Sequence, residues 1–106
     1  MGIAIKKLTG DGYAFETISV TNTAVGFTGN TWRIGDHTHI RAVVTATGGV
    51  MRYRYDGGDP TAGAGHLLSH GDMIIVEGSV NIVNFRVIRA GTENGILSVT
   101  YERLYG

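Results

Sequence analysis

The chain is 106 residues long, 42% of its residues are hydrophobic, and nine basic residues balance nine acidic ones to a formal net charge of zero. This length suits one domain with a single hydrophobic core, while the balanced charge excludes a disordered charged tail and offers no basic footprint for nucleic acid. The absence of cysteine excludes disulfides and thiolate metal sites, so stability must come from packing or from assembly.

Residues that favour β-strands dominate the composition. Val, Ile and Thr together make up 32 of the 106 residues, and the 17 glycines are spread so widely that no long segment favours a helix. Short β-rich runs between glycine-bearing turns are typical of a sandwich or barrel. We therefore predict an all-β fold, a single-domain antiparallel β-sandwich over residues 1–106, with jelly-roll and immunoglobulin-like topologies both open. The predicted strands are 3–8, 13–21, 24–28, 38–47, 50–55, 72–77, 82–90 and 96–104.

The first run does not resemble a secretory signal. It contains only a short apolar stretch, and Lys6 and Lys7 follow that stretch where a signal would have them precede it. No other stretch is long and apolar enough to span a membrane. We expect no membrane partner.

Trp32 is the only tryptophan and lies in GNTWRIGD, between two turn signals. Its large apolar ring predicts a residue that caps one end of the core, with an anchoring contact to a partner as the alternative.

His37 and His39 alternate at the start of the next predicted strand, a spacing that two imidazole ligands of a transition metal can use. Further ligands would have to come from distant histidines such as His66 or His70, and alternating histidines are common on exposed strand faces. We therefore predict no metal and no other cofactor. The serines lie in no recognisable catalytic motif, and we predict that the protein is not an enzyme.

The strongest strand signal is the alternation over residues 38–47. Ile40, Ala42, Val44 and Ala46 form its predicted core face. The glycines at 48 and 49 then predict a tight hairpin that returns the next strand beside this one.

On that returning strand, residues 50–55, two arginines share a face. Arg52 and Arg54 cannot enter an apolar core unpaired, so their face should meet solvent, a partner or carboxylates. A long loop over residues 56–70 follows, and such loops are usually functional or ordered by a partner. Asp56 and Asp59 within it resemble part of a calcium loop, but the full spacing is absent, and a structural turn with Pro60 at its exit is the better interpretation.

The predicted strand 82–90 places Val83, Phe85 and Val87 on the core face and Arg86 on the other, and residues 91–95 predict a hairpin to the last strand. Arg86 thereby joins the two earlier arginines in a basic patch, which has two open interpretations: internal ion pairs with the loop carboxylates or contact with a neighbouring subunit. The candidate protein-contact residues are Arg52, Arg54, Asp56, Asp59 and Arg86.

An ordered series of short motifs in the second half carries a resemblance to a known group. The series comprises RYRYDGGDPT at 52–61, GHLL at 65–68, GD at 71–72, Gly78, FRVIR at 85–89 and LSVTY at 97–101. It resembles a group of small tailed-bacteriophage structural proteins encoded among capsid genes. The element DGGDPT also resembles a structural turn of immunoglobulin-like modules appended to carbohydrate-active enzymes. Residues 1–47 carry no such resemblance.

The phage resemblance implies a non-enzymatic virion protein, made in the host cytoplasm and placed on the head surface as a capsid decoration or cement protein. Its expected partners are the major capsid protein and copies of itself, with a trimer at a local threefold axis as the expected assembly. Head-tail connection, a tail component, and a carbohydrate-binding or adhesive module are the alternatives. The alternation places Tyr53, Tyr55 and Tyr101 among apolar neighbours, which disfavours sugar stacking.

Overall fold

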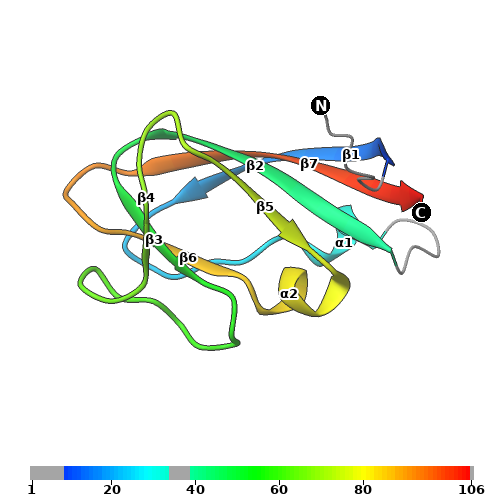
Figure 1. Cartoon of the computed structure of the whole chain (residues 1–106). Coiled ribbons are helices and arrows are strands. Elements are labelled where there is room, and N and C mark those ends of the chain that lie inside the picture. The colour runs from blue at the N-terminus through cyan, green and yellow to red at the C-terminus, as the bar shows by residue number, and fades with distance from the viewer. Residues whose placement is uncertain (1–8, 34–38, 106) are drawn as a thin grey trace, which may run out of the picture.

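The computed structural model describes residues 9–33 and 39–105, which form two packed antiparallel sheets (Figure 1). One sheet has the strand order β1-β7-β2-β5 and the other has the order β4-β3-β6. Two short helices lie in the connections. The elements are β1 (Thr9–Val20), α1 (Gly29–Trp32), β2 (Ile40–Gly48), β3 (Met51–Arg54), β4 (His66–Leu68), β5 (Met73–Glu77), α2 (Ser79–Asn84), β6 (Arg86–Arg89) and β7 (Gly95–Tyr105). The predicted all-β sandwich is confirmed.

The core lies between the sheets and follows the alternation of the strands. In β2 the predicted core face is confirmed, because Ile40, Ala42, Val44 and Ala46 are all fully buried. The opposing sheet contributes Met51 and Val87, and Phe85, which lies between α2 and β6, is also fully buried. Trp32, at the end of α1, is buried as well, which confirms its predicted place at the margin of the core.

Strand pairing decides between the two topologies that the sequence left open. The first strand, β1, pairs with the last, β7, along its whole length, whereas the immunoglobulin-like arrangement pairs the first strand with the second. Val25 forms an isolated antiparallel bridge to Val87 of β6, so the chain around it takes the place of an eighth strand. With the Val25 segment placed beside β6, the four-stranded and three-stranded sheets follow the strand order of a jelly roll.

Both predicted hairpins are wrong, because the strands that flank each turn belong to different sheets. The chain crosses from β2 to β3 through Gly48 and Gly49, and from β6 to β7 through residues 91–95. The two crossings lie against each other: the Gly49 N–H donates to the Asn94 carbonyl at 3.0 Å, and Gly48 pairs with Gly95. A Cβ on Gly49 would lie 2.3 Å from the Glu93 carbonyl oxygen. These glycines permit close approach of two backbones rather than a local reversal.

The predicted strand over residues 82–90 is wrong in its first half. After Gly78, whose φ is +94°, the chain forms the helix α2, and only Arg86–Arg89 are extended as β6. The helix buries Ile82 and leaves Val83 53% exposed, while Phe85 is buried as predicted. A crossing between sheets needs to change direction, and one helical turn provides that change where a continuous strand does not.

Three smaller differences concern the extent and the number of the elements. The predicted strand 24–28 is reduced to the single bridge at Val25. The predicted loop 56–70 ends early, because His66–Leu68 pair with β3 as the strand β4, and the helical turn α1 was not predicted. The predicted strand 3–8 and His37 of the histidine pair lie outside the described residues. Within the described ranges, neither helix has the length or hydropathy that crossing a membrane requires.

A buried tyrosine of β7, Tyr101, forms a hydrogen bond to Glu16 of the neighbouring strand β1, on the inner side of the sheet. The hydroxyl of Tyr101 donates to Glu16 Oε2, and the same carboxylate oxygen accepts the Thr28 N–H at 3.1 Å. Burial and then the hydrogen bond to Glu16 raise the pKa of Tyr101 well above its ordinary value, so the hydroxyl remains a donor throughout the range in which proteins are handled.

Replacing Gly49 by Ala should lower the free energy of unfolding by about 2 kcal/mol or more, because the two crossings must separate to admit the methyl group. Urea denaturation measures this change. The matched control is Gly63→Ala, whose Cβ meets nothing within 4 Å; it should shift stability by less than about 0.5 kcal/mol. Equal effects of the two substitutions would contradict the close-approach explanation.

Tyr101→Phe should lower stability by about 1–2 kcal/mol, because it removes the hydroxyl that the Glu16 carboxylate accepts. Thermal and urea unfolding are the measurements. Tyr55→Phe removes a hydroxyl from an exposed side chain and serves as the control. An unchanged midpoint for Tyr101→Phe would show that the hydrogen bond contributes nothing net.

Candidate protein-contact surfaces

The long connection between β3 and β4 is held by an arginine at each of its ends. Arg52 of β3 donates from Nε to the Ala62 carbonyl at 3.1 Å and from Nη1 to the Gly65 carbonyl at 2.8 Å. A guanidinium that satisfies two backbone carbonyls of a loop orders the loop without a partner. The end of the loop nearest β4 is therefore tied to the strand from which the loop departs.

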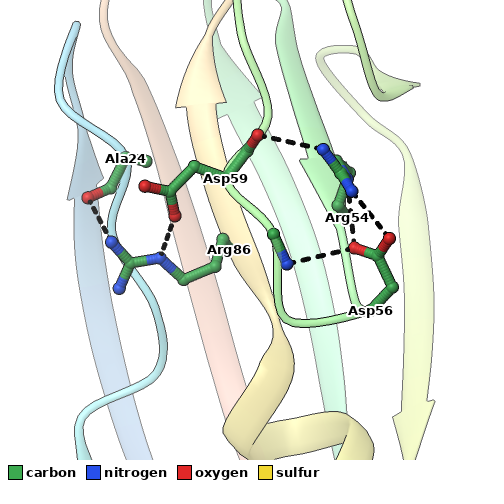
Figure 2. Close-up of polar contacts among 6 residues, drawn as sticks. Ala24, Arg54, Asp56, Asp59 and Arg86 are labelled. Atoms are coloured by element: carbon green, nitrogen blue, oxygen red, sulfur yellow. Dashed lines mark hydrogen bonds and ion pairs between the residues drawn. The ribbon is translucent and has the colours of Figure 1, made fainter.

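Arg54 holds the other end of this loop (Figure 2). Its guanidinium donates two hydrogen bonds to the Asp56 carboxylate, from Nε at 3.0 Å and from Nη2 at 2.7 Å, and a third from Nη1 to the Asp59 carbonyl at 3.2 Å. Asp56 also accepts the Gly58 N–H at 3.2 Å, and Gly57 between them has a φ of +93°. This is the predicted structural turn, in which an aspartate caps a nearby amide.

Arg86 of β6 ties the loop to the first part of the chain. It lies directly opposite Arg54 across the β3–β6 pair, an arrangement of like charges that is unfavourable unless it is compensated. Asp59 supplies the compensation: its carboxylate accepts Arg86 Nε at 2.8 Å while its carbonyl accepts Arg54 (Figure 2). Arg86 also donates to the Ala24 carbonyl at 3.2 Å.

The structure thus joins four of the five candidate residues, Arg54, Asp56, Asp59 and Arg86, in one network, and the loop carboxylates pair with arginines of the same chain. Arg52 binds backbone carbonyls of the same loop instead. The side chains of Asp56 and Asp59 nevertheless remain 63% and 62% exposed. The loop is therefore an ordered, charged surface, and the carboxylates of both of its ion pairs remain accessible to solvent or to a partner.

The hydrogen bonds from Arg54 change the pKa of Asp56. The hydrogen bonds from Arg54, with a smaller contribution from the Gly58 N–H, lower the pKa of Asp56 from 3.8 to about 2. A carboxyl whose pKa is lower in the folded state stabilises that state above its unfolded pKa. The contribution is lost as the pH falls from 3.8 toward about 2.

A second surface is the outward side of the four-stranded sheet, which we call the outer face. The pairings place Phe15, Thr100, Val43 and Ile75 in one row across β1, β7, β2 and β5. The next row is Thr17, Ser98, Thr45 and Met73, followed by Ser19, Ile96 and Thr47. No residue of these three rows is charged. Phe15 is 62% exposed, Met73 60% and Ile75 52%.

Charges on this sheet gather at one end of the outer face. Arg41 of β2 pairs with Glu102 of β7 on one side, at 2.6 Å, and lies opposite Glu77 of β5 on the other. The uncharged rows are therefore bounded by a charged row, as is usual for a protein contact with an apolar centre and a polar rim. Sequence reasoning missed this face, although the successive apolar residues of MIIVE in β5 signal apolar side chains on both sides of the strand.

A groove of about 400 Å³ lies between the edge of β5 and two tyrosines, Tyr53 in β3 and Tyr55 directly after it. It is lined by Tyr53 and Tyr55 on one side, and by β5 residues and Asn81 on the other. Glu77 is the one charged residue among those that line it. No group of three or more His, Asp or Glu residues able to hold a metal ion occurs in the ranges 9–33 and 39–105.

Comparison with known proteins identifies no relative: no family model matches the chain, and neither a curated protein nor a solved structure shows significant similarity to it.

Titration of Asp56 tests the loop network. The side-chain carboxyl carbon, followed by NMR, should titrate with a midpoint of about 2, and Arg54→Gln should move that midpoint up toward 3.8. Arg52→Gln is the control, because Arg52 binds carbonyls of the same loop and makes no hydrogen bond to Asp56. A midpoint that does not respond to Arg54→Gln would mean that the two side chains are not paired in solution.

Proposed function

We propose that this chain is a non-enzymatic structural protein of a tailed-bacteriophage virion. In this proposal it is a decoration or cement protein that binds the shell of major capsid protein and stabilises it. The proposal begins with the motif series between residues 52 and 101, and the observation that supports it best is the outer face.

The outer face has the properties of a contact surface rather than of an ordinary solvated sheet. Antiparallel sheets that face water usually present polar side chains along each strand, yet here Phe15, Met73, Ile75 and Ile96 are all exposed. The side chains between them are mainly Thr and Ser, which bury with little desolvation penalty once hydrogen-bonded. A neutral protein binding a large protein surface through such a face needs no electrostatic attraction.

The ordered loop supports the same proposal. Binding through a loop that is already fixed loses less conformational entropy than binding through one that must be ordered on contact. The arginines fix this loop from within the chain, and the carboxylates of Asp56 and Asp59 keep an open side for a partner. Arg52, Arg54 and Arg86 thereby hold the loop in place for a partner, whether or not they contact the partner themselves.

The proposed location is the phage head surface, after synthesis in the host cytoplasm, with self-association as a trimer at a local threefold axis. A carbohydrate-binding role gains no support, because Tyr101 is fully buried and Tyr53 packs against the core, leaving Tyr55 as the exposed member of the three. Sugar-binding surfaces generally stack several exposed aromatic rings.

Co-sedimentation with shells of the parent phage that lack the protein tests this function. The wild-type chain should bind saturably at a fixed ratio to shell subunits. Phe15→Lys replaces a 62% exposed apolar side chain at the β1 side of the outer face by a charge and should weaken binding at least about tenfold, as expected for an apolar side chain that the contact buries.

The matched control is Thr92→Lys, the same charge introduced at an exposed position of the β6–β7 crossing, which should bind like the wild type. Failure of the wild-type protein to bind shells would reject the cement role in favour of the tail or adhesive alternatives. Normal binding by Phe15→Lys would move the contact away from the outer face.

A further inference from the structure

The four edge strands of the two sheets, β1, β5, β4 and β6, are not equally protected against pairing with another strand. β1 has a register shift between Gly12 and Ala14, and β4 is only three residues long. The outer edge of β6 is covered by the segment around Val25, which follows β1 in the chain, since Val87 and Val25 exchange backbone hydrogen bonds. Bulges, shortness and coverage are the usual means of blocking sheet extension.

The edge of β5 has none of these protections. Its pairing with β2 is regular from Glu77 to Met73, and within the described residues no strand pairs with its other side (Figure 1). It carries no lysine and no proline, and its outward side chains Met73 and Ile75 are exposed and apolar. A regular, apolar, unpaired edge is a template for an added strand.

Hydrogen bonds at both ends of the β2–β5 pair show which backbone groups are available. Gly78 N–H donates to the Ile40 carbonyl, and Ala46 N–H donates to the Asp72 carbonyl, both at 2.9 Å. Backbone groups of antiparallel strands alternate in direction, so the even-numbered residues of β5 face β2. The N–H and C=O groups of Met73 and Ile75 and the N–H of Glu77 therefore point to the open edge, whereas the Glu77 carbonyl already accepts a hydrogen bond from Asn81 Nδ2 at 3.0 Å.

The groove beside this edge provides room for side chains of such a strand. An added strand directs alternate side chains to the two sides of the sheet. On the inner side they enter the groove of about 400 Å³ against Tyr53 and Tyr55, and on the outer side they lie beside Met73 and Ile75. Backbone pairing along an edge with pockets for alternate side chains is the general form of peptide binding by β-augmentation.

We propose that the β5 edge and its groove bind an extended segment of a partner protein, which adds as a fifth strand to the four-stranded sheet. The segment has apolar or aromatic side chains at alternate positions, and a basic side chain where it passes Glu77, the one charged residue lining the groove. This binding site is independent of the virion role and stands if that role fails.

Charge favours a foreign strand over a second copy of β5. The strand reads MIIVE and contains no basic residue, so antiparallel pairing of two β5 edges supplies no counter-charge to either Glu77. A partner strand with a Lys or Arg at that point satisfies both the charge and the hydrogen-bonding groups of the edge.

The probe is a displayed library of linear ten-residue peptides selected against the full chain, followed by synthesis of the enriched sequences. Enriched peptides should show apolar side chains at alternate positions and a basic residue. On binding, amide hydrogen exchange should slow at Met73, Ile75 and Glu77, whereas the amides of Ile74 and Val76, which face β2, should change little.

Ile75→Pro is the decisive variant, because it removes an N–H that points to the open edge and leaves the hydrogen bonds to β2 in place. Peptide affinity should fall at least about tenfold. Ile75→Thr, which keeps the N–H and the β-branched shape, is the matched control and should retain binding. Ile75→Lys, an edge lysine that blocks pairing without changing the backbone, replaces the proline variant if that variant does not fold.

Three results would overturn the proposal. Selection could return no peptide that binds the wild-type chain, or peptides that bind Ile75→Pro and Ile75→Lys as well as the wild type. Sedimentation could instead show a concentration-dependent dimer that Ile75→Pro abolishes and Phe15→Lys leaves intact, which would assign the edge to a second copy of the chain. Each result can be told apart from a failure of shell binding, because Phe15 lies on β1, at the far side of the sheet.

Discussion

The close contact between the two glycine-containing crossings determines the rest of the sandwich. On one side of this contact, β2 pairs with β7, and on the other side β3 pairs with β6. The Gly49–Asn94 and Ala90–Val50 hydrogen bonds continue the pairing through the crossings. The segment from β2 to β3 and the segment from β6 to β7 are therefore one long antiparallel ribbon, folded over so that each half lies in a different sheet. Side chains at positions 48 and 49 would keep the two backbones apart, and a side chain at position 95 would collide with the buried Met51 side chain, so all three positions are glycine.

The same folded ribbon assembles the charged loop. Because β3 and β6 are neighbours, Arg54 and Arg86 meet directly across the pair, and two guanidinium groups in that position require an anion between them. Asp59 occupies that position, and its backbone and carboxylate each bind one arginine. The strand pairing thus places two like charges side by side, and the hydrogen bonds with which Asp59 compensates them help to order the loop. Its surface follows from the topology, since neither arginine alone determines where Asp59 lies.

The two sides of β5 offer different chemistry to a partner. The outer face presents side chains, mainly apolar and hydroxyl groups spread over four strands, and suits a broad contact with another folded surface. The open edge presents backbone groups along one strand, beside a groove with tyrosine walls, and suits a single extended segment. Met73 and Ile75 belong to both, so a bound segment would extend the outer face by one strand. Occupation of the edge and binding through the face are in that respect compatible.

The sequence by itself determined the fold class, the inward face of β2, the burial of Trp32 and the exclusion of the arginines from the core, because alternation and the cost of burying unpaired charge act locally along a strand. Only the tertiary structure decided that glycines 48 and 49 join two sheets instead of forming a hairpin, that residues 79–84 form a helix, and that β1 lies beside β7. A glycine pair permits a tight turn and a close backbone contact equally well, and the choice depends on a neighbour, Asn94, that is distant in sequence. Ion pairs between the arginines and the loop carboxylates were one of the two interpretations that the sequence left open. The choice of partners, the position of Asp59 between two arginines and the open edge of β5 depend on strand order, which no local pattern encodes.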